Sequence, residues 1–154
     1  MQTAINTFIK STIDVLKIQT KTEAVVGKAE VQKNSLHLNG DVSGIIALVS
    51  SQVSGSFIIS FPADTYLKIL SSMLRTEFKE LKPEIADGAS ELANMILGTA
   101  KAELNQKGFN FQSAIPTVVM GKSHIFPAGK NMTSLLVPFT SNFGNFTIEF
   151  RMIS

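Results

Sequence analysis

The spacing of apolar residues along the start of the chain predicts a helix over residues 3–18. Apolar positions recur there every three or four residues, which is the period of one face of an α-helix. Lys10, Asp14 and Lys17 fall on the other side of this helix. The face expected to be buried consists of Ile5, Phe8, Ile9, Thr12, Ile13 and Leu16.

The pattern then changes to one that is typical of antiparallel strands joined by hairpins. Three segments are rich in β-branched residues and are interrupted by glycine, namely 23–31, 41–51 and 54–61. Pro62 ends this run, and residues 63–76 predict a second, shorter helix. Asp64 is placed to act as its N-cap or as an acid in its first turn.

The strongest helical pattern follows, over residues 84–106. Pro83 precedes it, and proline suits the first helical turn because its missing N–H has no partner there. Glu84 and Asp87 lie early in the helix, where negative charge is favoured by the helix dipole. Gly108 stands just beyond the end, a common position for the residue that terminates a helix.

The rest of the chain again predicts strands. The last segment is the clearest, because Phe146, Ile148 and Phe150 alternate with polar residues at the two-residue period of a strand. Residues 121–131, with two glycines and Pro127, predict a loop. The three strand-like segments are 109–120, 133–140 and 143–152.

A weak internal repeat relates the two halves of the chain. Residues 5–16 align with residues 93–104 at an offset of 88, and 54–60 align with 143–149 at an offset of 89. Each half is then a long helix followed by strands. The prediction is an α+β fold with pseudo-two-fold symmetry, in which a long antiparallel sheet carries two long helices and one shorter helix on one face. Residues 1–154 are expected to form a single domain.

Composition narrows the classes of function. A hydrophobic fraction of 44% indicates a folded chain, and the mean hydropathy of +0.20 suggests that some apolar surface is buried between subunits. A formal net charge of +2 without a cluster of lysine or arginine argues against nucleic-acid binding. The chain has no cysteine, so thiolate chemistry, cysteine-ligated metals and disulfides are excluded. His37 and His124 stand alone, and no metal site is expected.

The location of the protein is also constrained by the sequence. No apolar run approaches the length of a membrane span, and the first residues lack the pattern of a secretory signal. We therefore expect a cytoplasmic protein with no membrane association. Lys122 and His124 lie in the predicted loop, where a solvated position explains them better than a role in binding phosphate.

The helix over 84–106 has a polar face with candidate chemistry. At 100° per residue, six residues share the side opposite the apolar face: Asp87, Glu91, Asn94, Gly98, Lys101 and Asn105. We call this set the polar stripe. Glu91 and Asn94 are three residues apart, so their side chains emerge as neighbours. Gly98 follows one turn later, where glycine costs about 1 kcal/mol relative to alanine and leaves room for another molecule. On this pattern alone, a solvated helix face is the better explanation.

The stretch DGASELANMILGTAKAELNQKG resembles the active-site helix of the CheC/CheX/FliY phosphatases, CheX-type members above all. The signature is Glu-x-x-Asn on a long helix followed by a proline, here Glu91, Asn94 and Pro116. Residues 41–48, 54–61 and the closing PF…FGNFTIEF run also resemble this family, so the similarity covers nearly the whole chain.

The resemblance implies a phosphatase that acts on the phosphoaspartate of a CheY-like receiver domain. Asn94 would position the attacking water and Glu91 would pair with a lysine of the receiver. Asp87, Gly98 and Lys101 would contact the same partner. The resemblance further implies that Mg²⁺ is supplied by the receiver rather than by this chain, and that the protein is a homodimer.

CheC-type members carry a second site on the first long helix, and this chain departs from that pattern. Asn6 aligns with Asn94, but Thr3 stands where Glu91 would be. One working site is therefore expected. Two alternatives stay open: a non-catalytic module that docks a receiver or a motor component, and a structural, dimer-forming protein in which the motif arose by chance.

Overall fold

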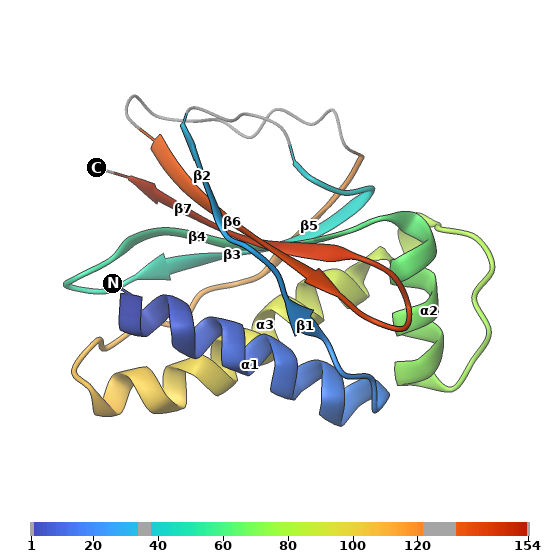
Figure 1. Cartoon of the computed structure of the whole chain (residues 1–154), viewed down its shortest axis with the longest axis horizontal. Coiled ribbons are helices and arrows are strands. Elements are labelled where there is room, and N and C mark those ends of the chain that lie inside the picture. The colour runs from blue at the N-terminus through green and yellow to red at the C-terminus, as the bar shows by residue number, and fades with distance from the viewer. Residues whose placement is uncertain (1, 34–37, 122–131, 154) are drawn as a thin grey trace.

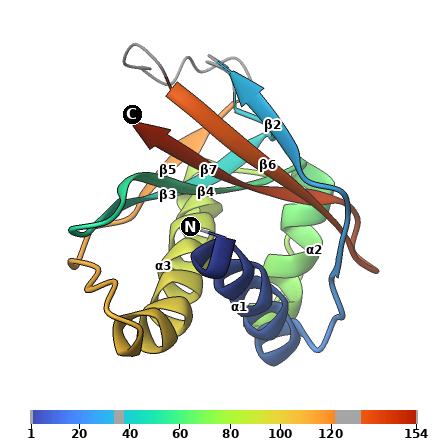
Figure 2. The same ribbon diagram turned by 60° about the vertical axis from the view of Figure 1, so that its left-hand side comes forward.

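The computed structural model describes residues 2–33, 38–121 and 132–153, which form a layer of helices against an antiparallel sheet (Figure 1). All the helices of these segments cover the same face of the sheet, and this arrangement is also clear from the second viewpoint (Figure 2). Two long helices run side by side in opposite directions, and a shorter one stands at the end of the layer. They are α1 (Gln2–Thr20), α2 (Ala63–Leu74) and α3 (Pro83–Gln106). The three predicted helices are thus confirmed.

The sheet contains seven strands within the described residues, and the strand pairings among these residues are antiparallel. Two hairpins form its centre, and their inner strands β4 and β7 pair with each other. The strand order is β1-β6-β7-β4-β3-β5, with β2 also pairing with β6. The strands are β1 (Val25–Val26), β2 (Glu30–Lys33), β3 (Val42–Val49), β4 (Ser54–Phe61), β5 (Thr117–Met120), β6 (Met132–Thr140) and β7 (Phe146–Ile153).

This strand order contains the predicted pseudo-two-fold axis, which passes between β4 and β7. The hairpin β3–β4 of the first half corresponds to the hairpin β6–β7 of the second, and α1 corresponds to α3. The first strands of the halves are exchanged: β1 and β2 pair with β6 of the second half, while β5 pairs with β3 of the first. Helix α2 has no counterpart among the described residues of the second half. The α+β prediction is confirmed.

Most of the predicted strand over 109–120 is a loop. Only Thr117–Met120 of the segment 109–120 forms a strand. Before it, Gly108 and Asn110 adopt left-handed φ angles of +88° and +54°, which interrupt the extended conformation of a strand. Phe109 and Phe111 are nevertheless buried, with ring centroids 5.8 Å apart. Their apolar character therefore reflects core packing by a loop.

The predicted strand over 23–31 is split into β1 and β2. Val26 lies opposite Phe139, whereas Glu30 lies opposite Leu136, so four steps on one strand match three on β6. This one-residue excess is a β-bulge. It occurs beside Pro138, which has no N–H to donate, although Gly27 N–H still donates to the Pro138 carbonyl at 2.7 Å.

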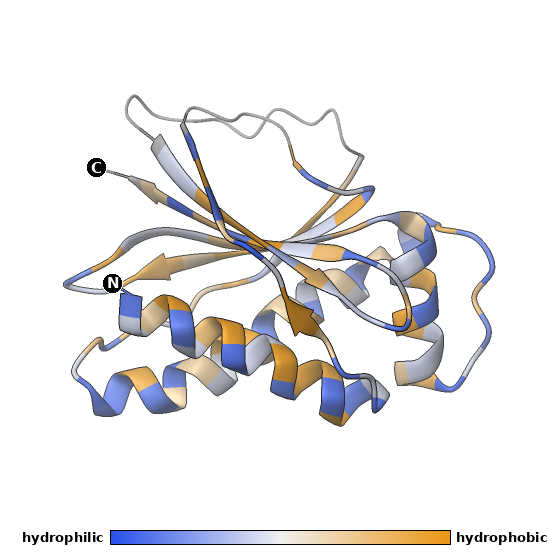
Figure 3. Cartoon of the chain, in the orientation of Figure 1, coloured by the Kyte–Doolittle hydropathy of each residue, from blue (hydrophilic) through white to orange (hydrophobic). Residues whose placement is uncertain are grey.

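The core fills the space between the helices and the inner face of the sheet. Orange, hydrophobic positions alternate with blue ones along α1 and α3 (Figure 3). Alanines of α3 allow close packing, and Phe8 of α1 reaches Phe57 and Phe150 of the sheet, with ring centroids 5.1 and 5.4 Å away. Ile5, Ile9 and Ile13, expected to be buried, are half-buried. The buried face of α1 is rotated toward smaller residues, because α1 lies directly against α3.

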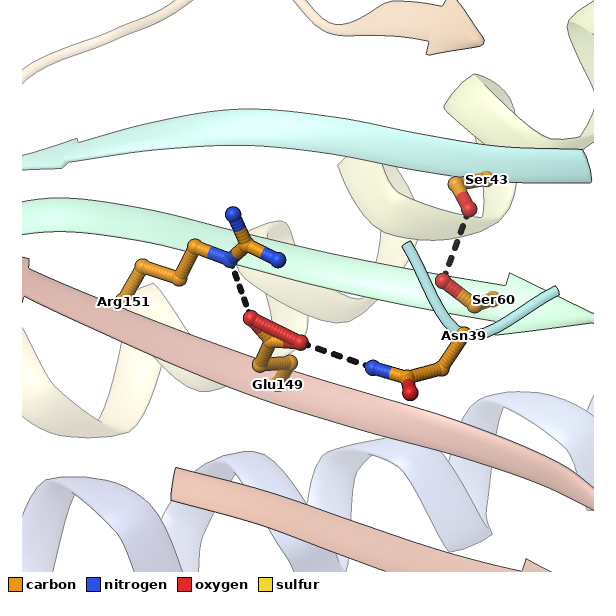
Figure 4. A network of polar contacts seen from close by, with 5 residues as sticks. All are labelled: Asn39, Ser43, Ser60, Glu149 and Arg151. Atoms are coloured by element: carbon orange, nitrogen blue, oxygen red, sulfur yellow. Dashed lines mark hydrogen bonds and ion pairs between the residues drawn. The ribbon is translucent and has the colours of Figure 1, made fainter. Parts of the chain in front are cut away.

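The opposite face of the sheet carries a buried polar network (Figure 4). Glu149 and Arg151 of β7 are each only 2% exposed and form an ion pair through Oε2 and Nε. Asn39 Nδ2 donates to the other carboxylate oxygen at 3.0 Å, and the hydroxyls of Ser43 and Ser60 bond at 2.7 Å. A charge pair of this depth requires such partners, since burial without them is strongly unfavourable. The network fixes the segment at Asn39 to the centre of the sheet.

Two glycines bring neighbouring elements close to α3. A Cβ on Gly44 of β3 would lie 2.1 Å from the Ala89 carbonyl oxygen, so only glycine lets the sheet approach the helix there. A Cβ on Gly88 would lie 2.5 Å from the Tyr66 hydroxyl of α2. The Tyr66 O–H donates to the Ile85 carbonyl, and burial raises the pKa of this phenol to about 12. These contacts hold α3 from two sides and leave its remaining face outward.

Candidate active site on helix α3

The outward face of α3 carries the polar stripe predicted from the sequence. Asp87, Glu91, Asn94 and Gly98 are exposed, whereas Lys101 and Asn105 are partly buried. On the opposite side Ala89, Leu92, Ile96 and Ala100 are completely buried against the core. The structure therefore brings the predicted site residues together along one face. The sequence also places Leu97 and Leu104 at the flank, and both are buried.

Glu91 and Asn94 present polar groups that the protein itself does not use. Over the described parts of the chain, neither side chain makes a hydrogen bond or an ion pair with another residue. The amide of Asn94 can both donate and accept hydrogen bonds without ionising, and the carboxylate of Glu91 can accept them from a cation. A second molecule can therefore engage both groups without breaking an existing contact.

Gly98 leaves the helix surface open one turn beyond Asn94. A Cβ built there would have no heavy atom within 4 Å, outside its own helix and its chain neighbours. Gly88 on the same helix has no such open space, because Tyr66 and Leu70 of α2 lie where its Cβ would be. The structure thus gives Gly88 a packing role that the sequence did not reveal.

Beyond Gly98, the polar stripe is used to hold the loop that follows α3. The Asn105 side-chain oxygen accepts a hydrogen bond from the Phe111 N–H at 2.9 Å, and Lys101 Nζ lies 3.5 Å from Ser113 Oγ. Pro116 directly precedes β5. The loop therefore runs back along α3, and Lys101 is partly committed to it, although its ammonium can still reach a partner.

A shallow groove between α1 and α3 opens beside Gly98. Its volume is about 340 Å³, and it is lined by Val15, Ile18, Gln19, Met95, Gly98 and Thr99. Ile18 is 77% exposed, whereas the other apolar residues of α1 are buried or half-buried. Neither Ile18 nor Met95 was assigned a functional role from the sequence. The signal was an apolar residue on the otherwise polar side of the first helix.

A different hollow, of about 770 Å³, lies between α2 and the segment that follows it. Its lining includes Leu67, Lys68, Arg75, Lys79 and Phe143. No residue of the polar stripe lines this hollow, so it is not part of the candidate site at Glu91 and Asn94.

The pseudo-symmetric position on α1 lacks the features of the α3 site. Asn6 is exposed, but its side-chain oxygen accepts a hydrogen bond from Gln2 Nε2 at 2.9 Å, and the neighbouring position is Thr3. No carboxylate stands at the place of Glu91.

Neither a cluster of metal ligands nor a helix able to span a membrane occurs in the part of the chain that the structure describes. Among the described residues, no three histidine, cysteine or acidic side chains gather in a way that could hold a metal ion. None of the helices described is both long and apolar enough to cross a membrane. His37, Lys122 and His124 lie outside the described residues.

The site therefore consists of a free amide and a free carboxylate on an open helix face. It has no nucleophile–base pair of the kind that activates a serine or cysteine. Such a site suits a substrate that is already reactive, for which water needs only to be positioned.

Comparison with known proteins identifies the family. The sequence model of the family described as Chemotaxis phosphatase CheX matches residues 42–140. A protein of Thermotoga maritima named CheY-P phosphatase CheX is 31% identical over 112 residues, which cover 71% of this chain and 67% of that protein.

Solved structures agree with this assignment. The crystal structure of the chemotaxis protein CheX from Vibrio vulnificus is similar with a TM-score of 0.83 and 35% identity, over 96% of this chain and 97% of that one. A chain of the CheX-CheY-BeF3-Mg²⁺ complex from Borrelia burgdorferi is similar with a TM-score of 0.69 and 27% identity, over 96% of each chain. The chain therefore belongs to the CheX family of chemotaxis phosphatases. The resemblance seen in the sequence is confirmed.

Proposed function

We propose that this chain hydrolyses the phosphoaspartate of a CheY-like receiver domain, with Asn94 as the residue that positions water and Glu91 as the residue that docks the receiver. The observation that carries the proposal is the pair of unengaged side chains, one helical turn apart, on the open face of α3. Membership of a family of chemotaxis phosphatases, and a relative named for its action on phosphorylated CheY, supply the substrate class.

Asn94 would act through its amide. Its carbonyl oxygen accepts a hydrogen bond from the attacking water, while its NH₂ group donates a hydrogen bond to a nearby oxygen. The water oxygen attacks phosphorus, the bond between phosphorus and the aspartyl oxygen breaks, and the products are the free carboxylate and inorganic phosphate. An acyl phosphate is an activated electrophile, so alignment of water supplies the assistance that it needs. A glutamine positions water in the same way in GTPases.

Glu91 would pair with a lysine of the receiver. Close ion pairs at interfaces contribute about 1.5–7 kcal/mol in favourable cases and fix the register of the two partners. With Glu91 anchored, Asn94 one turn away is held over the phosphoryl group. Asp87, Gly98 and Lys101 would form the surrounding contact surface.

The Mg²⁺ that offsets phosphoryl charge would be bound by the receiver. The Borrelia complex contains CheX, CheY, BeF3 and Mg²⁺ together. In this division of labour the complete active site exists only in the complex, which fits a chain whose site consists of one amide and one carboxylate.

The test is the decay of radiolabelled phosphate on a purified CheY-type receiver in the presence of Mg²⁺. Wild type should accelerate decay, Asn94→Ala should not, and Asn6→Ala should behave as wild type. The Asn94→Ala protein should still bind the receiver. Acceleration by Asn94→Ala would refute the role of Asn94.

The second candidate is a module that docks a receiver or a motor component without hydrolysis. It is favoured if wild type forms a complex with the receivers tested but accelerates decay of none. The unengaged amide of Asn94 supports the enzyme, because docking alone does not require it.

We further propose that residues 1–154 form one CheX-like domain, that the protein is cytoplasmic, and that it acts as a homodimer. The homodimer rests on the family resemblance and on the mean hydropathy of +0.20, because the strands at the two ends of the strand order, β1 and β5, are short and offer little edge for pairing. Light scattering at micromolar concentration tests the dimer: a monomeric mass would reject it.

A further inference from the structure

The groove beside Gly98 has a counterpart on the same pair of helices. A second groove, of about 260 Å³, is lined by Thr3, Asn6, Thr7, Lys10, Glu103 and Lys107. We call it the charged groove, and the one lined by Val15, Ile18, Gln19, Met95, Gly98 and Thr99 the apolar groove. The charged groove is formed by the first half of α1 and the end of α3, and the apolar groove by the end of α1 and the middle of α3. The two helices run in opposite directions (Figures 1 and 2).

The repeat offset of 88 relates the two grooves residue by residue. Thr7 corresponds to Met95, Lys10 to Gly98 and Glu103 to Val15. Lys107 corresponds to Gln19, and the exposed Gln106 corresponds to Ile18. The two grooves therefore share one backbone arrangement. At four of these five positions the apolar groove has an apolar residue or glycine, whereas all five counterparts at the charged groove are polar or charged.

The difference between the two grooves matches the difference between the candidate sites beside them. The apolar groove adjoins Asn94 with its Glu91, whereas the charged groove adjoins Asn6 with no carboxylate beside it. At the charged groove Lys107 Nζ lies 3.3 Å from Glu103 Oε1, a surface ion pair that satisfies both charges. Ile18 has no comparable reason to be exposed in the free protein, because an exposed isoleucine gains nothing from contact with water.

We infer that the apolar groove is the hydrophobic part of the docking surface for the receiver, so that the receiver spans both α1 and α3. This inference rests on the proposed function and adds to it a contact with the first helix. An apolar side chain of the receiver enters the groove and covers Ile18 and Met95, while Glu91 and Asn94 engage the phosphorylated site.

The position of the apolar groove favours the receiver, rather than a second copy of this chain, as the molecule that occupies it. Gly98 lines the groove and lies one turn from Asn94 on the same helix, so the groove and the catalytic pair form one continuous surface. A second copy seated on the groove would also cover the approach to Asn94. The partner that must reach Asn94 is therefore the one that fits the groove.

The experiment compares Ile18→Lys with Gln106→Lys, a matched substitution at the pseudo-equivalent position of α3. Both sites are exposed on helices, so both variants should fold, and thermal unfolding checks this. Two quantities are measured for a CheY-type receiver: KM and kcat for dephosphorylation, and Kd for the receiver trapped with BeF3 and Mg²⁺.

Ile18→Lys should raise KM and Kd about tenfold, the scale of one buried aliphatic side chain, and leave kcat unchanged. Gln106→Lys should change none of them. Ile18→Val should retain nearly all of the wild-type affinity. The split between KM and kcat separates this contact from Asn94, whose loss lowers kcat while binding persists.

Unchanged KM and Kd in Ile18→Lys, with wild type active, overturn the inference and leave the proposed function standing. Equal effects of Ile18→Lys and Gln106→Lys also overturn it, because a general charge effect would then suffice. A loss of dimer in Ile18→Lys with unchanged receiver binding assigns the groove to a second copy instead. If wild type binds the receiver but hydrolyses nothing, the proposed function fails, and Kd alone decides the inference.

Discussion

The two ends of the α1–α3 helix pair share one backbone arrangement and differ in what their side chains offer. Around Asn94 the surface is open: a free carboxylate, a free amide, a glycine with empty space above it and an apolar groove. Around Asn6 the surface is closed by its own contacts, since Gln2 bonds to Asn6 and Lys107 pairs with Glu103. A pseudo-symmetric fold can therefore place a site at one end only, by leaving one set of side chains without internal partners.

The largest expected effect comes from filling the open space at Gly98. Gly98→Leu places a branched side chain where a partner must approach, and it should weaken receiver binding about a hundredfold, equivalent to about 2.7 kcal/mol. Lys10→Ala, at the equivalent position of α1, should have no effect. Titration with the BeF3-trapped receiver measures both. Normal affinity in Gly98→Leu would show that the partner does not pass over this turn.

Removing the docking carboxylate should have the next largest effect. Glu91→Ala is expected to raise the receiver Kd by about tenfold or more, because close interfacial charge pairs contribute about 1.5 kcal/mol or more in favourable cases. Thr3→Ala at the equivalent position should leave Kd unchanged. The same titration, repeated at high salt, should reduce the difference between wild type and Glu91→Ala. A salt-independent difference would argue against an ion pair.

Two alanine substitutions on α3 should change stability in opposite directions. Gly98→Ala should stabilise the protein by about 0.5–1 kcal/mol, because the added methyl meets nothing and alanine favours a helix. Gly88→Ala should destabilise it by about 1–2 kcal/mol, because the methyl would overlap the buried Tyr66 and Leu70. Urea denaturation measures both. If both substitutions changed stability in the same direction, α2 would not pack against Gly88 as closely as described.

The smallest effect concerns the support that α2 gives to α3. Tyr66→Phe removes the hydrogen bond to the Ile85 carbonyl and should reduce stability by about 1 kcal/mol, with kcat unchanged. Burial raises the Tyr66 pKa to about 12, above the ordinary value of 10.0, so the unfolded chain loses this proton first as pH rises. The stability that wild type gains from the neutral phenol is complete below pH 10 and lost between about pH 10 and 12.

Tyr66→Phe has no phenol to titrate, so its stability should lack the loss that wild type shows between about pH 10 and 12. Denaturation midpoints of wild type and Tyr66→Phe across that range provide the comparison. Parallel curves for the two proteins would contradict the assignment.

The extent of α3 and the direction of its polar stripe could be predicted from the sequence because they depend on local signals. Pro83 and Gly108 mark its ends, and a helical period of 3.6 residues puts Glu91 and Asn94 on one face. Gly98 was also expected to leave open space. These features need no knowledge of distant residues.

Other features depend on contacts between segments far apart in the chain. The role of Gly88 requires Tyr66 of α2 above it, and the split of β1 from β2 requires Pro138 opposite. The apolar groove requires Ile18 and Met95 from two helices to meet. Phe109 and Phe111 suggested a strand because apolar content alone does not distinguish a strand from a loop that fills the core.

The exchange of first strands between the halves has a consequence for how such a protein changes over generations. Because β5 pairs with the first hairpin, and β1 and β2 pair with the second, neither half can lose these strands without exposing an edge of the other half. Selection must therefore keep both halves as scaffold, whatever each contributes to activity. A helix whose Asn6 has no carboxylate beside it is thus retained as architecture, and the surface around Asn6 is free to accumulate substitutions.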